Sequence, residues 1–401
     1  MSLFAPEGSR PRRSLILAGG GMRVAYQAGV LLALEEDGLT FFHGDGTSGG
    51  TMNLAMLLSG LSPAEMCERW RTLNVRDFVS FLRLKKYLRS LNWPAFGGAD
   101  SLVRKVYPHL GIDAERIRGA EGIEGTFNVC DFAEKTNWAV PHREVDEDLL
   151  VAGVSLPMLM PAVERGGKLY VDSVWIKDAN PSEAVRRGAE ELWLVWCIGN
   201  TSRYRDGAFN QYVHMIELSA NGGLFEELAH LRAELGDRLP VLHVIKPEYP
   251  LPLDPDFYLG RIDASALIAM GYRDAKRYLA SPSPADWGPS ATKMRDQPPG
   301  AAFAEKIEGA EIRVDIRDAD RFFSGDRTGE AVAVVNGRPA KSGSFALDGR
   351  WRTYDLVLEP DEHVSFRARG KLWRVRSLQA TGTDSIRRQA AIVARLARVL
   401  A

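Results

Sequence analysis

The stretch at residues 42–58 places one serine in the setting that a nucleophile needs. A strand-like approach ends in Gly-Thr-Ser-Gly-Gly and passes directly into the helix-favouring residues 52–58. This pattern predicts a strand, a sharp turn and a helix, with Ser48 at the turn. Glycines on both sides let the backbone take cramped dihedral angles, so that the hydroxyl is pushed into the open and the helix N-terminus favours developing negative charge. A plain Gly/Ser connection between strand and helix remains the alternative.

A second glycine-rich turn comes earlier, at residues 19–23, and reads Gly-Gly-Gly-Met-Arg. Consecutive glycines between a strand and a helix expose backbone N–H groups, as an anion-binding cradle does, and Arg23 adds a charge or braces the loop. A dinucleotide fingerprint is disfavoured because Val24 occupies its third glycine position. In a parallel sheet both turns lie at the same carboxyl edge. The loop is therefore expected to supply an oxyanion hole for Ser48.

The base that would activate Ser48 is sought first among the histidines. A Ser-His-Asp triad on an α/β-hydrolase sheet fits poorly, because only 47 residues precede the serine and that fold places several strands before its nucleophile. None of the histidines after Asp172 sits in a turn that recommends it as a triad member. These histidines are His214, His230, His243 and His363.

A carboxylate acting directly on the serine is the other possibility. Asp172 ends the predicted strand 169–172, and it would work as a base only in a water-poor site that raises its basicity. Asp45 is too close to Ser48 in the sequence. Asp178 is expected to cap the helix that starts after Pro181.

These three motifs, in this order, resemble the patatin-like phospholipase family. The glycine loop is similar to its GGGxR motif, the serine turn to its GxSxG motif, and Asp172, 124 residues after the serine, to its dyad aspartate. The resemblance covers residues 14–280 and implies a three-layer α/β/α fold without a cofactor. It also implies a lipid acyl hydrolase that works through an acyl-enzyme, with Ser48 as nucleophile and Asp172 as base. The implied oxyanion site comprises Gly19, Gly20, Gly21 and Arg23, with Gly49 after the serine.

The chain departs from the family pattern directly after the aspartate. Ser173 and Val174 stand where the family usually has two glycines, or a glycine and an alanine. This keeps open a catalytically weak or inactive protein that uses the same fold to bind lipid or a partner. A soluble esterase with a distant histidine is a third possibility.

Composition limits the partners and the compartment. The 401 residues are 45% hydrophobic, and 51 basic residues balance 52 acidic ones, so the overall charge gives no support for nucleic-acid binding. No secretory signal or bilayer-spanning segment is predicted. The three cysteines lack metal-ligand spacing and are expected to be buried thiols. These features predict a cytoplasmic protein, in peripheral contact with membranes at most, and leave the oligomeric state open.

Four regions are expected along the chain: a tail (1–13), the acyl hydrolase domain (14–280), a Pro-rich linker (281–300) and a small antiparallel β domain with a terminal basic helix (301–401). Within the second region the sequence predicts a parallel or mixed sheet covered on both faces. The predicted strands are 14–18, 125–131, 138–141, 169–172, 192–198 and 241–245, and the predicted helices are 24–36, 52–58, 61–73, 182–188, 210–235 and 262–279.

A basic amphipathic helix is predicted at residues 78–93. It either caps the core with a solvated basic face or lies on an anionic membrane. In the second case the protein would bind anionic vesicles in a salt-sensitive way.

Overall fold

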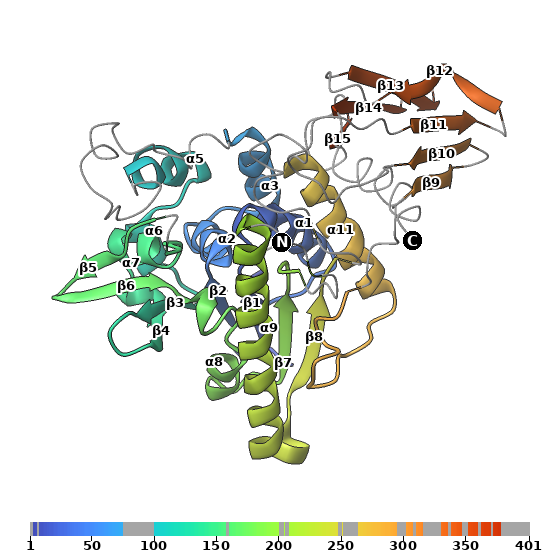
Figure 1. Ribbon diagram of the computed structural model, residues 1–401. Coiled ribbons are helices and arrows are strands. Elements are labelled where there is room, and N and C mark those ends of the chain that lie inside the picture. Colours follow the sequence, from blue (N-terminus) through green and yellow to red (C-terminus); the bar gives the residue numbers. More distant parts are fainter. Residues whose placement is uncertain are drawn as a thin grey trace.

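The computed structural model in Figure 1 describes residues 3–5, 8–74, 100–157, 160–199, 204, 208–247, 251 and 264–294, and the backbone of seven strands between residues 302 and 377. The helices predicted at 78–93 and 384–401 lie outside these residues.

The centre of the described structure is a mixed eight-stranded sheet with the order β5-β6-β3-β2-β1-β7-β8, in which β4 pairs with β3 off this path. The strands β3, β2, β1, β7 and β8 run parallel, and β4, β5 and β6 are antiparallel to their neighbours. The bounds are β1 Arg13–Leu17, β2 His43–Thr47, β3 Glu124–Asp131, β4 Thr136–Pro141, β5 Val163–Arg165, β6 Lys168–Asp172, β7 Glu191–Val195 and β8 Val241–Ile245. The predicted mixed sheet is confirmed, and β5 is an addition to it.

Helices flank this sheet and include short 3-10 and π segments (η). Their bounds are η1 Gly21–Val24, α1 Ala25–Glu36, α2 Gly49–Leu58, α3 Pro63–Thr72, η3 Leu102–Val106, α5 Tyr107–Leu110, α6 Ala114–Arg118, η4 His142–Glu144, α7 Glu147–Ala152, η5 Ser173–Trp175, α8 Pro181–Arg186, α9 Ala208–Leu235, η6 Gly236–Arg238 and α11 Ala264–Ala280. Helix α3, predicted at residues 61–73, begins with a capping box between Ser62 and Glu65. Helix α7 is not among the helices predicted from the sequence.

Alternate side chains of β1 enter two different cores. Leu15 and Leu17 pack with apolar residues of α1, α2, α3 and α11, whereas Ile16 and Ala18 at the strand end pack with residues of α8 and α9. Successive side chains of a strand point to opposite faces, so the two cores lie on the two sides of the sheet. The predicted three-layer α/β/α architecture is thereby confirmed.

Helices α1 and α11 cross with their backbones in contact at two glycines. A Cβ atom on Gly29 would lie 1.9 Å from the carbonyl oxygen of Ile268, and one on Gly271 would lie 1.9 Å from the carbonyl oxygen of Tyr26. Any side chain at either position would push the helices apart. Because α1 follows the first glycine turn, this contact helps to fix the loop that precedes it.

The predicted tail (1–13) and the predicted linker (281–300) both contain residues that pack against the main body. In the tail, Leu3 is buried and its carbonyl accepts the N–H of Phe41 at 2.7 Å. In the first part of the Pro-rich stretch, Trp287 is buried and its indole N–H donates to the carbonyl of Pro240 at 3.2 Å. Residues 285 and 287 therefore lie beside β8, where Ala285 N–H also donates to the carbonyl of Leu242 at 2.7 Å.

The described strands after residue 301 form two antiparallel sheets, with the orders β12-β11-β10-β9 and β13-β14-β15. Their bounds are β9 Ala302–Ile307, β10 Ala310–Asp315, β11 Glu330–Val335, β12 Arg338–Ala346, β13 Arg352–Glu359, β14 Glu362–Arg369 and β15 Leu372–Ser377. The predicted antiparallel character is confirmed.

Across the described part of the chain, no helix has both the length and the apolar character needed to cross a bilayer.

Candidate active site

The two glycine turns meet at the carboxyl ends of adjacent parallel strands. Leu17 of β1 pairs in register with Gly46 of β2, and both turns follow directly. A Cβ atom on Gly50 would lie 2.0 Å from the carbonyl oxygen of Leu17, and one on Gly49 would lie 2.7 Å from that of Gly21. The first turn of α2 therefore rests on the loop that starts η1, as the parallel pairing predicts.

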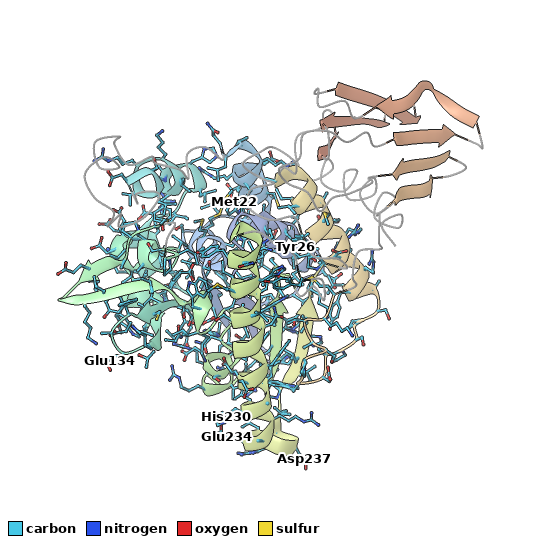
Figure 2. All side chains as sticks on the ribbon, viewed as in Figure 1. Met22, Tyr26, Glu134, His230, Glu234 and Asp237 are labelled. Atoms are coloured by element: carbon cyan, nitrogen blue, oxygen red, sulfur yellow. The ribbon has the colours of Figure 1, made fainter. Side chains whose placement is uncertain are left out.

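Figure 2 shows the position of this edge in the molecule. Met22, in the glycine loop, and Tyr26, in the first turn of α1, lie near the upper end of α9 in this view, whereas His230, Glu234 and Asp237 lie at its opposite end. The site is thus built at one end of the sheet, and the last three residues are far from it.

Ser48 occupies a strained backbone conformation between β2 and α2, with φ 52° and ψ −126°. Lys135 is the only other non-glycine residue with positive φ in the described part of the chain. Such conformations are unfavourable and gather at functional sites. One expectation is wrong: the serine is only 5% exposed, since Gly19 is so close that a Cβ on it would lie 3.0 Å from Cβ of Ser48.

Asp172 is fully buried at the end of β6 and faces Ser48. Its N–H donates to the carbonyl of Ser155 at 3.0 Å, and its Oδ1 accepts the N–H of Val174 at 2.9 Å. Burial raises the pKa of Asp172 to about 7, and the contacts with the Ser48 hydroxyl and the Val174 N–H lower it in part. The Ser48 contact is looser than a regular hydrogen bond, because Oδ2 of Asp172 has no partner at hydrogen-bond geometry among the described residues.

Asp178 contacts the glycine loop directly. The N–H of Gly19 donates both to Oδ1 of Asp178, at 3.1 Å, and to its carbonyl oxygen, at 3.2 Å. This N–H is therefore already engaged, which leaves Gly20, Gly21 and Gly49 as the predicted oxyanion donors. The expectation that Asp178 caps the next helix is wrong, because Asn180 caps α8 and accepts the N–H of Glu183 at 3.3 Å.

Gly21 and Gly49 are the first residues of η1 and α2. The earliest backbone bonds at these helix starts are Arg23 N–H to Gly20 O, at 3.1 Å, and Thr51 N–H to Ser48 O, at 3.0 Å. The N–H groups of Gly21 and Gly49 precede these bonds and carry the positive end of each helix dipole. Two helix starts in contact can therefore direct donors at one anionic atom.

Arg23 braces the glycine loop, which is one of the two roles that the sequence suggested. It is buried, and its Nε donates to the carbonyl of Gly20 at 3.0 Å. Burial and the nearby Asp172 carboxylate raise the pKa of Asp178 well above its usual range, and the charge of Arg23 lowers it in part.

A set of buried amides that sequence reasoning missed ties the two turns together. Gln27 donates to the carbonyl of Ala18 at 2.6 Å, and Asn53 donates to Oε1 of Gln27 and to the carbonyl of Val24, both at 2.9 Å. Trp70 of α3 donates to Oδ1 of Asn53 at 2.8 Å. The available signal was a lone amide side chain within each of two apolar helices, where a buried polar group needs partners.

The described residues around Ser48 and Asp172 were compared with the arrangements that a histidine base or a metal ion would need. None of the described contacts of Ser48 and Asp172 involves a histidine, and His243 stacks on Trp193 with ring centroids 4.1 Å apart. Within the described ranges, no group of three or more His, Cys, Asp or Glu side chains is arranged to hold a metal ion.

The chain was compared with solved structures, with curated proteins and with models of protein families. The crystal structure of VipD from Legionella pneumophila is similar to this chain with a TM-score of 0.40 and 12% sequence identity, over 69% of this chain and 68% of that one. No curated protein matches the chain. Residues 15–185 match the family model described as patatin-like phospholipase, and this span includes both glycine turns and Asp172. Over residues 15–185 the chain is therefore similar to the patatin-like phospholipases.

Proposed function

We propose that the protein is a serine lipid acyl hydrolase that uses Ser48 as nucleophile and Asp172 as its base. The observation that carries the proposal is the contact between a serine in a strained turn and a buried carboxyl group whose pKa is about 7. A base works best when its pKa lies near the working pH, and burial provides that match here. The family match supports hydrolysis of lipid esters in general.

The reaction has two halves. In the first, ionised Asp172 accepts the Ser48 proton while Oγ attacks the ester carbonyl carbon, and the carbonyl oxygen becomes an oxyanion. The N–H groups of Gly20, Gly21 and Gly49 are the proposed donors to this oxyanion. Their hydrogen bonds to it account for much of the reduction in the activation barrier. The intermediate then collapses: the carbon–oxygen bond to the alcohol breaks, the alcohol takes the proton from Asp172, and the acyl group stays on Ser48.

In the second half, water replaces the alcohol. Asp172 accepts a proton from the water as its oxygen attacks the acyl carbon, and the same N–H groups stabilise the second oxyanion. Collapse breaks the bond to Ser48 Oγ, which takes back a proton, and the fatty acid leaves. Each half returns Asp172 to its ionised state.

Hydrolysis of a short chromogenic acyl ester and of phospholipid vesicles tests the proposal. Wild type should hydrolyse at least one of them, and Ser48→Ala and Asp172→Asn should each lose on the order of a thousandfold or more in kcat. The exposed Ser283 and Asp237 provide matched controls, and Ser283→Ala and Asp237→Asn should keep wild-type rates.

A fluorophosphonate probe gives an independent readout, because it reacts covalently with an activated serine. It should label wild type and the controls and leave Ser48→Ala unlabelled. An unlabelled wild type without turnover on either substrate would reject the hydrolase and favour an inactive lipid- or partner-binding protein.

A further inference from the structure

Two consecutive residues of β3 lie in register with the two halves of the proposed dyad. Asn128 pairs with Thr47, which directly precedes Ser48, and Val129 pairs with Asp172. The distance between the nucleophile and its base therefore depends on β3, a strand that contains neither residue. Whatever fixes the side chains of β3 to its neighbours also fixes that distance.

Asn128 is the residue that makes these connections. It is fully buried, and its Nδ2 donates to Oδ1 of Asp45 at 2.7 Å, to Oγ1 of Thr47 at 3.0 Å and to the carbonyl of Gly46 at 3.2 Å. Its three partners all belong to the strand that leads into Ser48. The amide nitrogen of Asn128 thus holds the approach to the nucleophile.

The other end of the same side chain connects to the base. Oδ1 of Asn128 accepts the amide N–H groups of Asn137 and Asn180, each at 2.8 Å. Asn137 in turn accepts the hydroxyl of Ser173, which directly follows Asp172 and is fully buried. A continuous chain of side chains therefore runs from Ser173 through Asn137 and Asn128 to Thr47.

The hydrogen-bond directions along this chain are consistent. Ser173 donates to Asn137, Asn137 donates to Asn128, and Asn128 donates to Thr47. Hydrogen bonds aligned in one direction strengthen one another, and a buried network with every member paired is rigid. This rigidity suits a device that holds two reacting groups in place.

Ser173 also stands at the position where the sequence departs from its family. It starts η5, a 3-10 turn, and in the described part of the chain Ser48 and Lys135 are the only non-glycine residues with positive φ. Ser173 therefore adopts a backbone conformation that any residue tolerates, so the missing glycine costs no strain. In exchange, the chain gains a hydroxyl that enters the network.

We propose that Asn128 and Ser173 are positioning residues that set the separation of Ser48 and Asp172 through Asn137. This proposal rests on the proposed function. Misplacing a catalytic group by about an ångström can lower the rate by orders of magnitude, so loosening the network should lower kcat more than it changes KM.

Ser173→Gly is the sharpest test, because the two possible roles of Ser173 predict opposite outcomes. If the hydroxyl positions Asp172, the variant should lose about tenfold in kcat on the chromogenic ester, with KM within about twofold of wild type. If the serine is only tolerated, glycine should leave kcat unchanged or raise it, and that result overturns the proposal. Ser283→Gly, on the exposed surface, is the matched control.

Asn137→Ala removes the middle residue of this series of hydrogen bonds. Asn137 is half-buried, so the variant is expected to fold. It should reproduce the loss in kcat, and the double variant Ser173→Gly/Asn137→Ala should be no slower than either single variant, because one connection is cut in each case. A double variant that shows the product of the two losses contradicts a shared network. Thermal unfolding of all variants separates lost positioning from lost folding.

Wild type, Ser48→Ala and Asp172→Asn belong in the same experiment. If wild type turns over, both of these variants are inactive, and Ser173→Gly and Asn137→Ala match wild type, only the positioning proposal fails. If wild type neither turns over nor reacts with the fluorophosphonate probe, both proposals fail.

Discussion

The carboxylate of Asp172 acts on Asp178, which lies six residues later and is also buried. Burial is the largest cause of the raised pKa of Asp178, and the carboxylate of Asp172, six residues earlier, is the second. Two acids this close in a site of low dielectric do not ionise together easily. If Asp172 is the base, its ionised form therefore disfavours the charged form of Asp178, and the charge of Arg23 offsets this in part.

The rate of ester hydrolysis should rise with pH and level off. A base acts only when ionised, and burial raises the pKa of Asp172 to about 7, so kcat/KM is expected to be low at pH 5 and to reach its plateau near pH 8. A profile of kcat/KM on the chromogenic ester from pH 5 to 9, at constant ionic strength, measures this. A flat profile, or one that falls through pH 7, would contradict Asp172 as the base.

Two substitutions of Asp178 should distinguish its role as a hydrogen-bond acceptor from any role of its charge. Asp178→Asn keeps an acceptor for the N–H of Gly19 and resembles the neutral acid, so kcat is expected within about threefold of wild type. Asp178→Ala removes the side-chain acceptor and loosens the glycine loop, so kcat should fall about tenfold with little change in KM. Asp237→Ala, at the far end of α9 in Figure 2, is the control. Equal rates for the Ala and Asn variants would show that the loop does not need this contact.

The free energy of unfolding should fall between pH 4 and pH 7, and Asp45 should cause part of the fall. Burial raises the pKa of Asp45 to about 7 in the folded protein, whereas an unfolded aspartate has a pKa of about 3.9. Between these values the folded state binds more protons than the unfolded state, so stability decreases as pH rises.

Asp45→Asn removes the titrating carboxyl group and keeps a polar side chain beside Thr126 and Asn128. Urea unfolding at several pH values should show a shallower loss of stability for the variant between pH 4 and 7. An unchanged slope would mean that Asp45 ionises normally in the folded state.

The same substitution in two helices should have opposite effects on stability. Gly29→Ala places a Cβ where the carbonyl of Ile268 lies, so it should destabilise the protein by several kcal/mol or prevent folding. Gly222→Ala in α9 meets no atom within 4 Å and should stabilise it by up to about 1 kcal/mol, because alanine is the better helix former. Denaturant unfolding measures both, and a stable Gly29→Ala variant would contradict the close crossing of α1 and α11.

Features that depend on neighbouring residues could be predicted from the sequence. The two glycine turns, the strands before them and the capping box at Ser62 each follow from a few adjacent residues. The meeting of the turns also followed, because parallel pairing brings the carboxyl ends of strands to one edge. Local rules, together with the pairing of parallel strands, were sufficient for these parts of the fold.

Features that depend on residues far apart in the chain could not be predicted. Asn128 bonds to Asn180 across 52 positions and to Thr47 across 81, and nothing in their local sequences marks them as partners. The burial of Ser48 and the use of the Gly19 N–H by Asp178 depend on the same kind of packing. Residues 78–93 lie outside the described structure, so their membrane contact stays a prediction.

The position of β1 has a consequence for how this domain can be inherited. β1 pairs with β2 on one side and with β7 on the other, and β7 begins at Glu191, beyond the family match at 185. A gene segment that ended at residue 185 would encode a sheet in which β1 had become an edge strand, and it would lack α9, which packs against Ile16. Recombination that moves this domain between genes must therefore carry at least β7 and α9 along with the matched segment.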